Sequence, residues 1–110
     1  MAYCPDRGDI AWLDFNPQAG REQAKRRPAI VLSPKAYNRK VGLAIVCPIT
    51  SKIKGYPFEI RLPDGLPVSG VILSDQIKSM DWRVRRMEFI AHTPASVMTE
   101  IVAKINTLLP

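Results

Sequence analysis

The chain changes from a polar loop to an apolar strand within Glu22–Pro34, which reads Glu-Gln-Ala-Lys-Arg-Arg-Pro-Ala-Ile-Val-Leu-Ser-Pro. The basic part ends at Arg27, and an aliphatic run rich in β-branched residues follows Pro28. A short run of this composition, bounded by proline, is typical of a buried strand, so we expect a strand over residues 28–33. The loop before it, residues 18–27, is longer than the ~4 to 6 residues of most connections, which favours a functional role.

Positive charge is concentrated in this loop and just after it. From Arg21 to Lys40 the chain has seven bases and one acid, Glu22, whereas the remaining residues sum to zero, so the whole chain carries a net charge of +6. A local excess of this kind points to an anionic partner, although a charge run can also be no more than a solvated surface. Glu22 precedes Arg27 by five residues. A carboxylate close to fixed cations is the pairing that phosphodiester chemistry uses.

Length and composition set the class of protein. The 110 residues, 46% hydrophobic and 24% charged, fit one globular domain over residues 1–110. Cys4 and Cys47 form neither a zinc pattern nor a disulfide framework, and Cys47 lies in an apolar run that predicts a buried thiol. No signal-peptide pattern follows Met1, and the longest uncharged runs hold 11 residues, short of the ~20 of a membrane helix. We expect a cytoplasmic protein with no membrane contact and no metal or other cofactor.

The rest of the chain predicts short strands and one clear helix. Extended segments are expected at residues 10–15, 43–49, 57–62 and 70–74, with a last extended piece over roughly 82–91, and one helical turn is expected at 34–39. The closing helix is predicted to have Thr93 as its N-cap and Pro94 at its first position, followed by apolar residues at 3.6-residue spacing. Short strands with Gly/Pro turns and one final helix predict an α+β fold, a small, strongly bent, barrel-like antiparallel β-sheet with a C-terminal α-helix.

Several short motifs, in order and in register from Gly8 to the C-terminus, resemble those of the MazF/PemK (Kid) toxin family, and of its MazF-type members most. These motifs are Gly8-Asp9-Ile10, Asp14-Phe15-Asn16-Pro17, Gly20-Arg21-Glu22-Gln23, Arg27-Pro28-Ala29, Asn38, Pro48-Ile49-Thr50, Gly70-Val71, Asp75-Gln76 and Ile105-Asn106. The resemblance implies the SH3-like barrel shared with the CcdB and Kid toxins. It also implies a homodimeric endoribonuclease toxin of a type II toxin–antitoxin system, which inhibits growth by cutting mRNA.

The resemblance further implies how this activity works. Single-stranded RNA would be cut at short specific sequences, without metal and independently of the ribosome, by attack of the 2′-OH. The products would carry 5′-hydroxyl and 2′,3′-cyclic phosphate ends. A cognate MazE-like antitoxin would block the RNA groove with a flexible tail, and operator DNA would be bound only through the antitoxin complex.

Three residues match the MazF-type catalytic pattern: Glu22, Arg27 and Thr50. Glu22 is the candidate base for the 2′-OH proton, because nearby cations favour its ionised form. Arg27 is the candidate phosphate clamp, and Thr50 could hydrogen-bond a phosphate oxygen from the end of a strand. The plainer alternatives are a loop carboxylate paired with an arginine, a surface cation, and an ordinary strand-terminal hydroxyl.

Other polar residues have weaker assignments. The residues expected to contact the RNA backbone are Arg21, Lys25, Arg26, Lys52, Lys54, Arg83, Arg85 and Arg86. Kid-type members use a histidine, an arginine and an aspartate, of which only Asp75 is retained here, so we expect it to be structural rather than catalytic. His92 matches no catalytic position. Trp12 and Trp82 could stack on bases, although packing in the core or in a dimer interface is favoured for both.

Two other functions compete with RNA cleavage. A CcdB-like toxin would poison DNA gyrase by protein contact alone, but the Trp-Gly-Ile ending of such chains is absent from the sequence, which ends Asn106-Thr107-Leu108-Leu109-Pro110. A plain nucleic-acid-binding domain would use the basic loop but would leave Glu22 unexplained, because an acid weakens phosphate binding.

Overall fold

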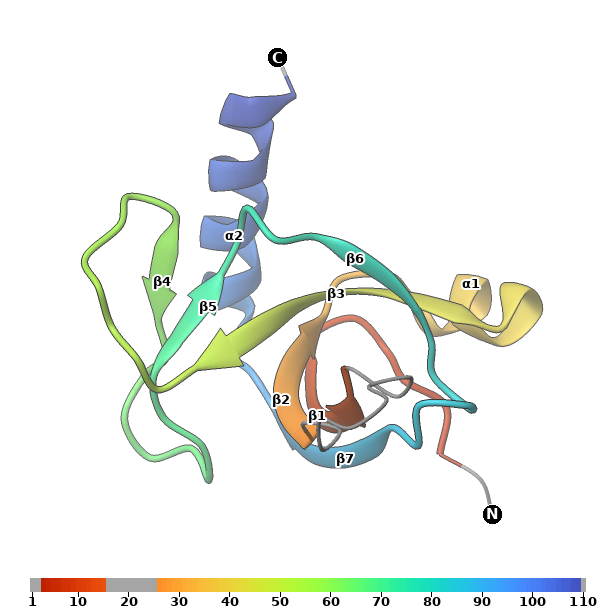
Figure 1. The fold of residues 1–110 in the computed structure, drawn as a ribbon. Helices are drawn as coiled ribbons and strands as arrows, with labels where there is room; N and C mark the ends of the chain where they lie inside the picture. The colour runs from red at the N-terminus through yellow and green to blue at the C-terminus, as the bar shows by residue number, and fades with distance from the viewer. Residues whose placement is uncertain (1–2, 16–25, 110) are drawn as a thin grey trace, which may run out of the picture.

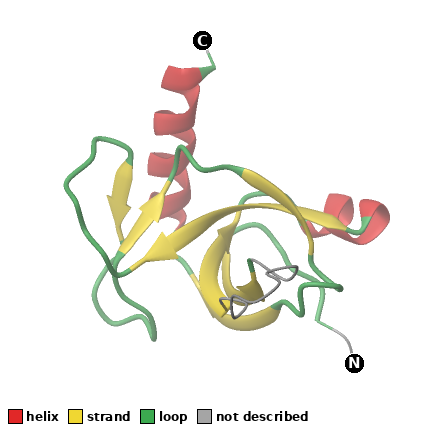
Figure 2. Cartoon of the chain, viewed as in Figure 1, coloured by secondary structure: helices red, strands yellow, loops and turns green. Residues whose placement is uncertain are grey.

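The computed structural model describes residues 3–15 and 26–109, which form seven strands and two helices (Figures 1 and 2). In chain order these are β1 (Asp9–Asp14), β2 (Arg26–Val31), α1 (Lys35–Val41), β3 (Leu43–Thr50), β4 (Glu59–Arg61), β5 (Val71–Leu73), β6 (Lys78–Asp81), β7 (Glu88–His92) and α2 (Ala95–Leu108). All strand pairs are antiparallel, in the order β4-β5-β3-β2-β1-β7, and β6 pairs with β3. The predicted α+β class is confirmed: an antiparallel sheet is followed by a C-terminal helix.

The sheet bends into a ring in Figure 1, but the strand pairing does not close it as a barrel. Among the described residues, β6 pairs with β3 and β7 pairs with β1, and no ladder joins β6 to β7. The segment between them was predicted to be extended, and this was wrong for residues 82–87, which form a turn. The Asp81 carboxylate accepts the N–H groups of Arg83 and Val84 and so stabilises that turn.

Both faces of the central strands are buried, because neighbouring residues alternate between two hydrophobic clusters. The first cluster, against α2, contains Ile10, Ile30, Cys47, Ile49, Ile60, Leu62, Ile72, Val97, Met98 and Ile101. The second contains Ala11, Leu13, Ala29, Val31, Ala44, Val46, Met80, Trp82 and Met87. A slip of one residue would exchange the two sets, so the register of β1, β2 and β3 is strongly specified. The positions of side chains at the ends of these strands are fixed in consequence.

Three local features differ from the sequence-based expectation. β2 begins at Arg26, two residues early, because Arg26 pairs with Asp14 of β1. The helix α2 begins at Ala95, one residue after Pro94, and Thr93 is not its N-cap. The Thr93 N–H donates to the Gly8 carbonyl at 2.9 Å, which extends the pairing of β7 with β1. The Thr93 Oγ1 is buried without a hydrogen-bond partner in the described structure. The strand β6 was not predicted. Cys47 is fully buried, as its apolar neighbours indicated.

Candidate active site

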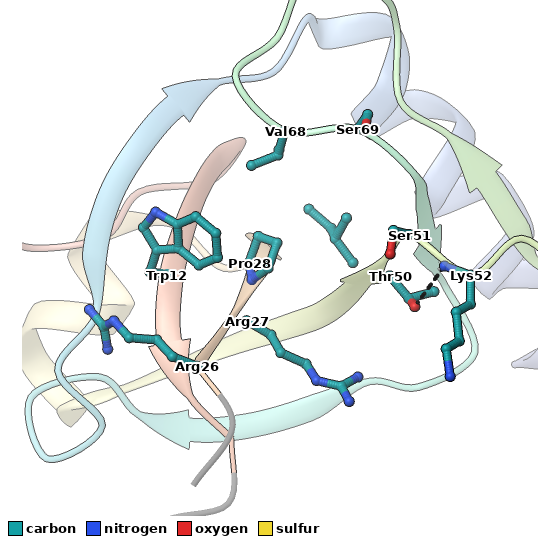
Figure 3. A pocket seen from close by; sticks show the side chains of 10 residues that line it. Trp12, Arg26, Arg27, Pro28, Thr50, Ser51, Lys52, Val68 and Ser69 are labelled. Carbon is teal, nitrogen blue, oxygen red and sulfur yellow. Dashed lines mark hydrogen bonds between the residues drawn. The ribbon is translucent and has the colours of Figure 1, made fainter. Parts of the chain in front are cut away.

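Two grooves open beside each other at the ends of β2 and β3, and three residues line both of them. The first, here called the Trp12 groove, has a volume of about 460 Å³ and is lined by Trp12, Arg26, Arg27, Pro28, Ile49, Thr50, Ser51, Lys52, Val68 and Ser69 (Figure 3). The second, the Tyr56 groove, has a volume of about 310 Å³ and is lined by Arg27, Thr50, Lys52, Lys54, Tyr56, Glu59, Leu73, Asp75 and Gln76. The shared residues, Arg27, Thr50 and Lys52, were all predicted to contact RNA.

The pairing of β2 with β3 explains why Arg27 and Thr50 come together. The ladder between the two antiparallel strands ends with Ala29 paired to Pro48. Arg27 lies two residues before Ala29 and Thr50 two residues after Pro48, so both leave the ladder at the same end. Arg27 is exposed at the start of β2, so its permanent positive charge is available to an anion in either groove.

Within residues 3–15 and 26–109, the Thr50 hydroxyl group accepts one hydrogen bond and donates none. Its Oγ1 accepts the Lys52 N–H at 3.1 Å, shown as a dashed line in Figure 3, and a hydroxyl that accepts one bond can still donate its own proton. The Thr50 backbone is held from behind by Gly70, where a Cβ atom would lie only 2.2 Å from the Thr50 carbonyl oxygen. Glycine is therefore required at position 70, and Thr50 is placed by close backbone packing.

The loop after β3 brings two cations and an aromatic ring to the Tyr56 groove. Glu59 organises this loop, because its carboxylate accepts the N–H groups of Lys54 at 3.1 Å and Gly55 at 2.9 Å. The Lys54 ammonium lies 5.9 Å from the centre of the Tyr56 ring, which is 60% exposed. An exposed ring beside lysines is suited to stacking on a nucleic-acid base. Sequence analysis missed Tyr56, although an aromatic residue next to Lys52 and Lys54 was the available signal.

Asp75 and Glu59 line the Tyr56 groove together with Arg27 and Thr50, so two carboxylates of the described residues reach this site. The backbone hydrogen bond from the Gln76 N–H to the Leu73 carbonyl, at 3.1 Å, closes the turn that contains Asp75.

The Cys47 thiol lies close to this turn. Its burial, and to a smaller extent the charge of Asp75, raises the pKa of the Cys47 thiol to about 12. Cys47 is therefore an inert thiol beneath the groove rather than a nucleophile.

Three of the predicted RNA-binding arginines, Arg26, Arg85 and Arg86, bond to Asp14 or to its neighbour Phe15, and Arg26 also lines the Trp12 groove. Arg26 and Arg86 both bind the Asp14 carboxylate, and Arg85 donates to the carbonyl oxygens of Asp14 and Phe15. The hydrogen bond from Arg86, and then that from Arg26, lower the pKa of Asp14 below its ordinary value. Arg83 stacks separately, with its guanidinium carbon 4.7 Å from the centre of the Trp82 ring.

Some predicted residues do not come to the grooves or lie outside the described residues. Glu22, Arg21 and Lys25 fall in the segment 16–25, which the structure does not describe. His92 lies at the end of β7, where its Nδ1 is 2.7 Å from the Asp9 carboxylate, and it lines neither groove. Trp82 is buried as predicted, whereas Trp12 is 36% exposed and forms one wall of the groove named after it.

Within residues 3–15 and 26–109, no three His, Cys, Asp or Glu side chains gather closely enough to hold a metal ion. None of the helices that the structure describes has the length and apolar character needed to span a bilayer.

Comparison with known proteins agrees with the geometry of the site. Residues 6–109 match the model of the family described as PemK-like, MazF-like toxin of type II toxin–antitoxin system. The chain is 47% identical over 107 residues to the endoribonuclease toxin MazF of Escherichia coli K12, covering 97% of this chain and 96% of that protein. It is 31% identical to the endoribonuclease PemK of Escherichia coli, covering 94% of this chain and 81% of that protein.

Solved structures give the same result. A crystal structure of MazF from Deinococcus radiodurans superposes with a TM-score of 0.90 at 56% identity and covers 98% of both chains. A MazE–MazF crystal structure from the same organism superposes with a TM-score of 0.94 at 56% identity, covering 98% of this chain and 97% of that chain. These matches favour the ribonuclease prediction over the gyrase-poison alternative. The chain belongs to the PemK-like and MazF-like family of type II toxin–antitoxin systems, and it is a MazF-like endoribonuclease toxin.

Proposed function

We propose that this toxin cuts single-stranded RNA, mRNA included, at short specific sequences, without metal and independently of the ribosome. The observation that supports the proposal best is the meeting of Arg27 and Thr50 in the shared wall of the two grooves. One groove would hold the chain on each side of the scissile phosphate. That phosphate would then lie within reach of a guanidinium group and a hydroxyl donor.

The proposed reaction is a transesterification within the RNA. Glu22 takes the proton of the 2′-OH, the 2′-oxygen bonds to phosphorus, the bond from phosphorus to the 5′-oxygen breaks, and the leaving 5′-oxygen takes up a proton from water. The products are a 2′,3′-cyclic phosphate and a 5′-hydroxyl end. Arg27 and the Thr50 hydroxyl stabilise the negative charge that gathers on the phosphate oxygens in the transition state.

Residues around this centre would bind the rest of the RNA. Lys52 and Lys54 supply positive charge along the Tyr56 groove, and the exposed Tyr56 ring offers a surface on which one base can stack. Asp75 is the competing candidate for the base, because it is the one carboxylate besides Glu59 among the described residues that line this groove. Glu59 is already occupied by backbone N–H groups of the loop, so it is the less suitable of the two.

Three variants test the assignment. Glu22→Gln and Arg27→Ala are expected to keep their thermal unfolding transitions and to lose RNA cleavage in EDTA. Arg39→Ala removes an equally exposed arginine from α1, outside the grooves, and should cleave normally. Full activity of Glu22→Gln together with loss of activity in Asp75→Asn would transfer the role of base to Asp75. Full activity of Arg27→Ala would refute the proposed site.

The proposal extends to partners and assembly. A MazE-like antitoxin would hold the toxin inactive, and operator DNA would be bound only by that complex. The MazE–MazF crystal structures from Deinococcus radiodurans, which resemble this chain, support an antitoxin partner. The active form would be a homodimer of single-domain chains, acting in the cytoplasm where mRNA is translated. Light scattering of the purified toxin tests the dimer directly: a monomeric mass with full activity would refute it.

The bent sheet is proposed to be a member of the SH3-like barrel class shared with the CcdB and Kid toxins. The ring formed by β1, β2, β3, β6 and β7 supports this classification, although β6 and β7 are separated by the turn over residues 82–87. Slow hydrogen exchange on the N–H groups of those five strands, and fast exchange in the turn, would agree with it.

A further inference from the structure

Asp14 binds two arginines from distant parts of the chain. Its Oδ1 lies 3.1 Å from Nη1 of Arg26, and its Oδ2 lies 2.8 Å from Nε of Arg86. The Asp14 side chain is only 13% exposed, whereas that of Arg86 is 70% exposed. An ionised carboxylate in such a position needs charged donors on both oxygens, and it has them.

Three acceptors hold the two terminal nitrogens of the Arg26 guanidinium group. Besides Asp14, its Nη2 donates to the Arg86 carbonyl oxygen at 2.7 Å and to Glu88 Oε1 at 3.0 Å. Arg85 adds bonds to the carbonyl oxygens of Asp14, at 3.1 Å, and Phe15, at 3.0 Å. The first residue of β2 and the last residues of β1 are thus tied to the turn over residues 82–87.

The conformation of this turn indicates that the network is constrained. Arg86 has a φ of +53°, a left-handed conformation that residues other than glycine adopt rarely and that persists where surrounding contacts impose it. The contacts in question are the bonds from Arg86 to Asp14 and from Arg26 to the Arg86 carbonyl. The hydrogen bonds that hold Arg26 therefore also keep Arg86 in a strained backbone conformation.

The neighbour of Arg26 is the proposed phosphate clamp. Side chains of consecutive strand residues leave on opposite sides, and in Figure 3 those of Arg26 and Arg27 run in opposite directions from β2. Because the two residues are consecutive, fixing the Arg26 guanidinium group also fixes the direction in which the Arg27 side chain leaves the strand. Thr50 lines both grooves together with Arg27.

We propose that Asp14 is a positioning residue for RNA cleavage, which holds Arg26 so that Arg27 faces Thr50. This inference rests on the proposed function of Arg27 and Thr50. It gives Arg26 and Arg86 a role that was not predicted from sequence, because both bind the Asp14 carboxylate, although Arg26 also lines the Trp12 groove. A positioning role and a phosphate contact predict different kinetics, since a misplaced catalytic group lowers kcat and a lost phosphate contact weakens binding.

The experiment measures kcat, KM and the salt dependence of RNA binding for the full chain, with a defined single-stranded RNA in EDTA. Asp14→Asn keeps the shape of the side chain and removes its charge. We expect kcat to fall about 10- to 100-fold, the range for a catalytic group displaced by ~1 Å, and KM to stay within about twofold of the wild type. Asp64→Asn is the matched control for loss of one carboxylate, because Asp64 is exposed and has no ion pair among the described residues.

Arg86→Gln is the second variant, chosen because Arg86 is exposed and its replacement is expected to fold even if Asp14→Asn does not. We expect kcat to fall about 3- to 10-fold, as loss of one of two partners of Asp14 implies, with the slope of log binding constant against log salt unchanged. If Arg86 instead binds a phosphate, KM rises and the slope falls in magnitude by ~0.7.

The outcomes separate this inference from the proposal on which it rests. A folded Asp14→Asn variant with kcat within about twofold of the wild type would overturn the positioning role, as would a reduced salt slope in Arg86→Gln. Arg27→Ala in the same assay tests the proposed site itself. If Arg27→Ala is inactive while Asp14→Asn is normal, the present inference alone fails. If Arg27→Ala is fully active, the site fails and the positioning role with it.

Discussion

Replacing Gly70 by alanine should displace Thr50 and disable the site without touching a catalytic side chain. A Cβ atom at residue 70 would lie 2.2 Å from the Thr50 carbonyl oxygen, 2.9 Å from the Thr50 carbonyl carbon and 3.1 Å from Ser51 Cα. All three are backbone atoms, which cannot move aside as the end of a long side chain can. Because ordinary contacts begin at 3.4 Å, the Thr50 backbone and residue 70 must separate by about 1 Å.

Two costs add in the Gly70→Ala variant. The φ of Gly70 is +121°, which an alanine adopts at a cost of ~1 to 3 kcal/mol, and the overpacking adds ~1 to 3 kcal/mol. For a domain of this size each kcal/mol lowers Tm by ~4 °C, so we expect Tm to fall by ~10 °C or more. A shift of ~1 Å at a catalytic group can cost ~100-fold in rate, so kcat per folded molecule should fall by up to that factor.

The assay combines thermal unfolding with RNA cleavage in EDTA at a temperature where each variant is folded. Gly42→Ala is the matched control: Gly42 caps α1 with a φ of +83°, and a Cβ there would meet nothing within 4 Å. It should cost only ~1 to 2 kcal/mol of backbone strain and leave cleavage unchanged. If Gly70→Ala is no less stable and no less active than Gly42→Ala, the reasoning about close packing behind Thr50 is refuted.

Three further predictions concern a base platform, a buried thiol and a buried charge. Tyr56→Ala should weaken RNA binding by ~1 to 3 kcal/mol while Tyr56→Phe binds normally, as titration of a fluorescent RNA would measure, and equal binding by both variants would exclude stacking. Burial raises the pKa of the Cys47 thiol to about 12, so Cys47 should resist thiol reagents at pH 8 until the protein unfolds. In a mass-spectrometric time course, Cys47 should be labelled no faster than the protein unfolds. Arg86 and then Arg26 lower the pKa of Asp14 from 3.8, so the wild type should exceed Asp14→Asn in free energy of unfolding by a constant amount above about pH 5, and the excess should fall as the pH drops below 3.8 towards the folded pKa. An excess that stays the same from about pH 6 down to about pH 3, in denaturant titrations at each pH, would contradict this.

Much of the fold could be predicted because apolar residues decide it. In β1, β2 and β3 apolar side chains occur at both odd and even positions, which predicts two buried faces. The structure buries the two faces of these strands in two separate clusters. The strand β6 could not be predicted, because Lys78–Asp81 is mostly polar and is held by its ladder to β3 rather than by burial. The turn over residues 82–87 is stabilised by local hydrogen bonds to Asp81. Hydrophobic periodicity carries no information about such bonds, so the turn could not be predicted from it.

Part of the candidate site could also be predicted from the sequence, and part could not. Arg27 and Thr50 were selected from family motifs, and the register of β2 with β3 explains their meeting, since Ala29 opposite Pro48 is set by the apolar runs themselves. The partners of Arg26 and Arg86 could not be found from sequence, because the contacts join residues 12, 60 and 72 positions apart. A run of arginines is equally consistent with RNA and with an internal carboxylate until the carboxylate is located.

The most direct test of the central claim is the chemistry of the cut ends. Purified protein is incubated with a defined single-stranded RNA in EDTA, and the ends of the fragments are identified by mass spectrometry. Cleavage with 5′-hydroxyl and 2′,3′-cyclic phosphate ends, lost in Arg27→Ala, is the predicted result. Fragments with 5′-phosphate ends, or cleavage that appears only when a divalent metal is added, would contradict the account.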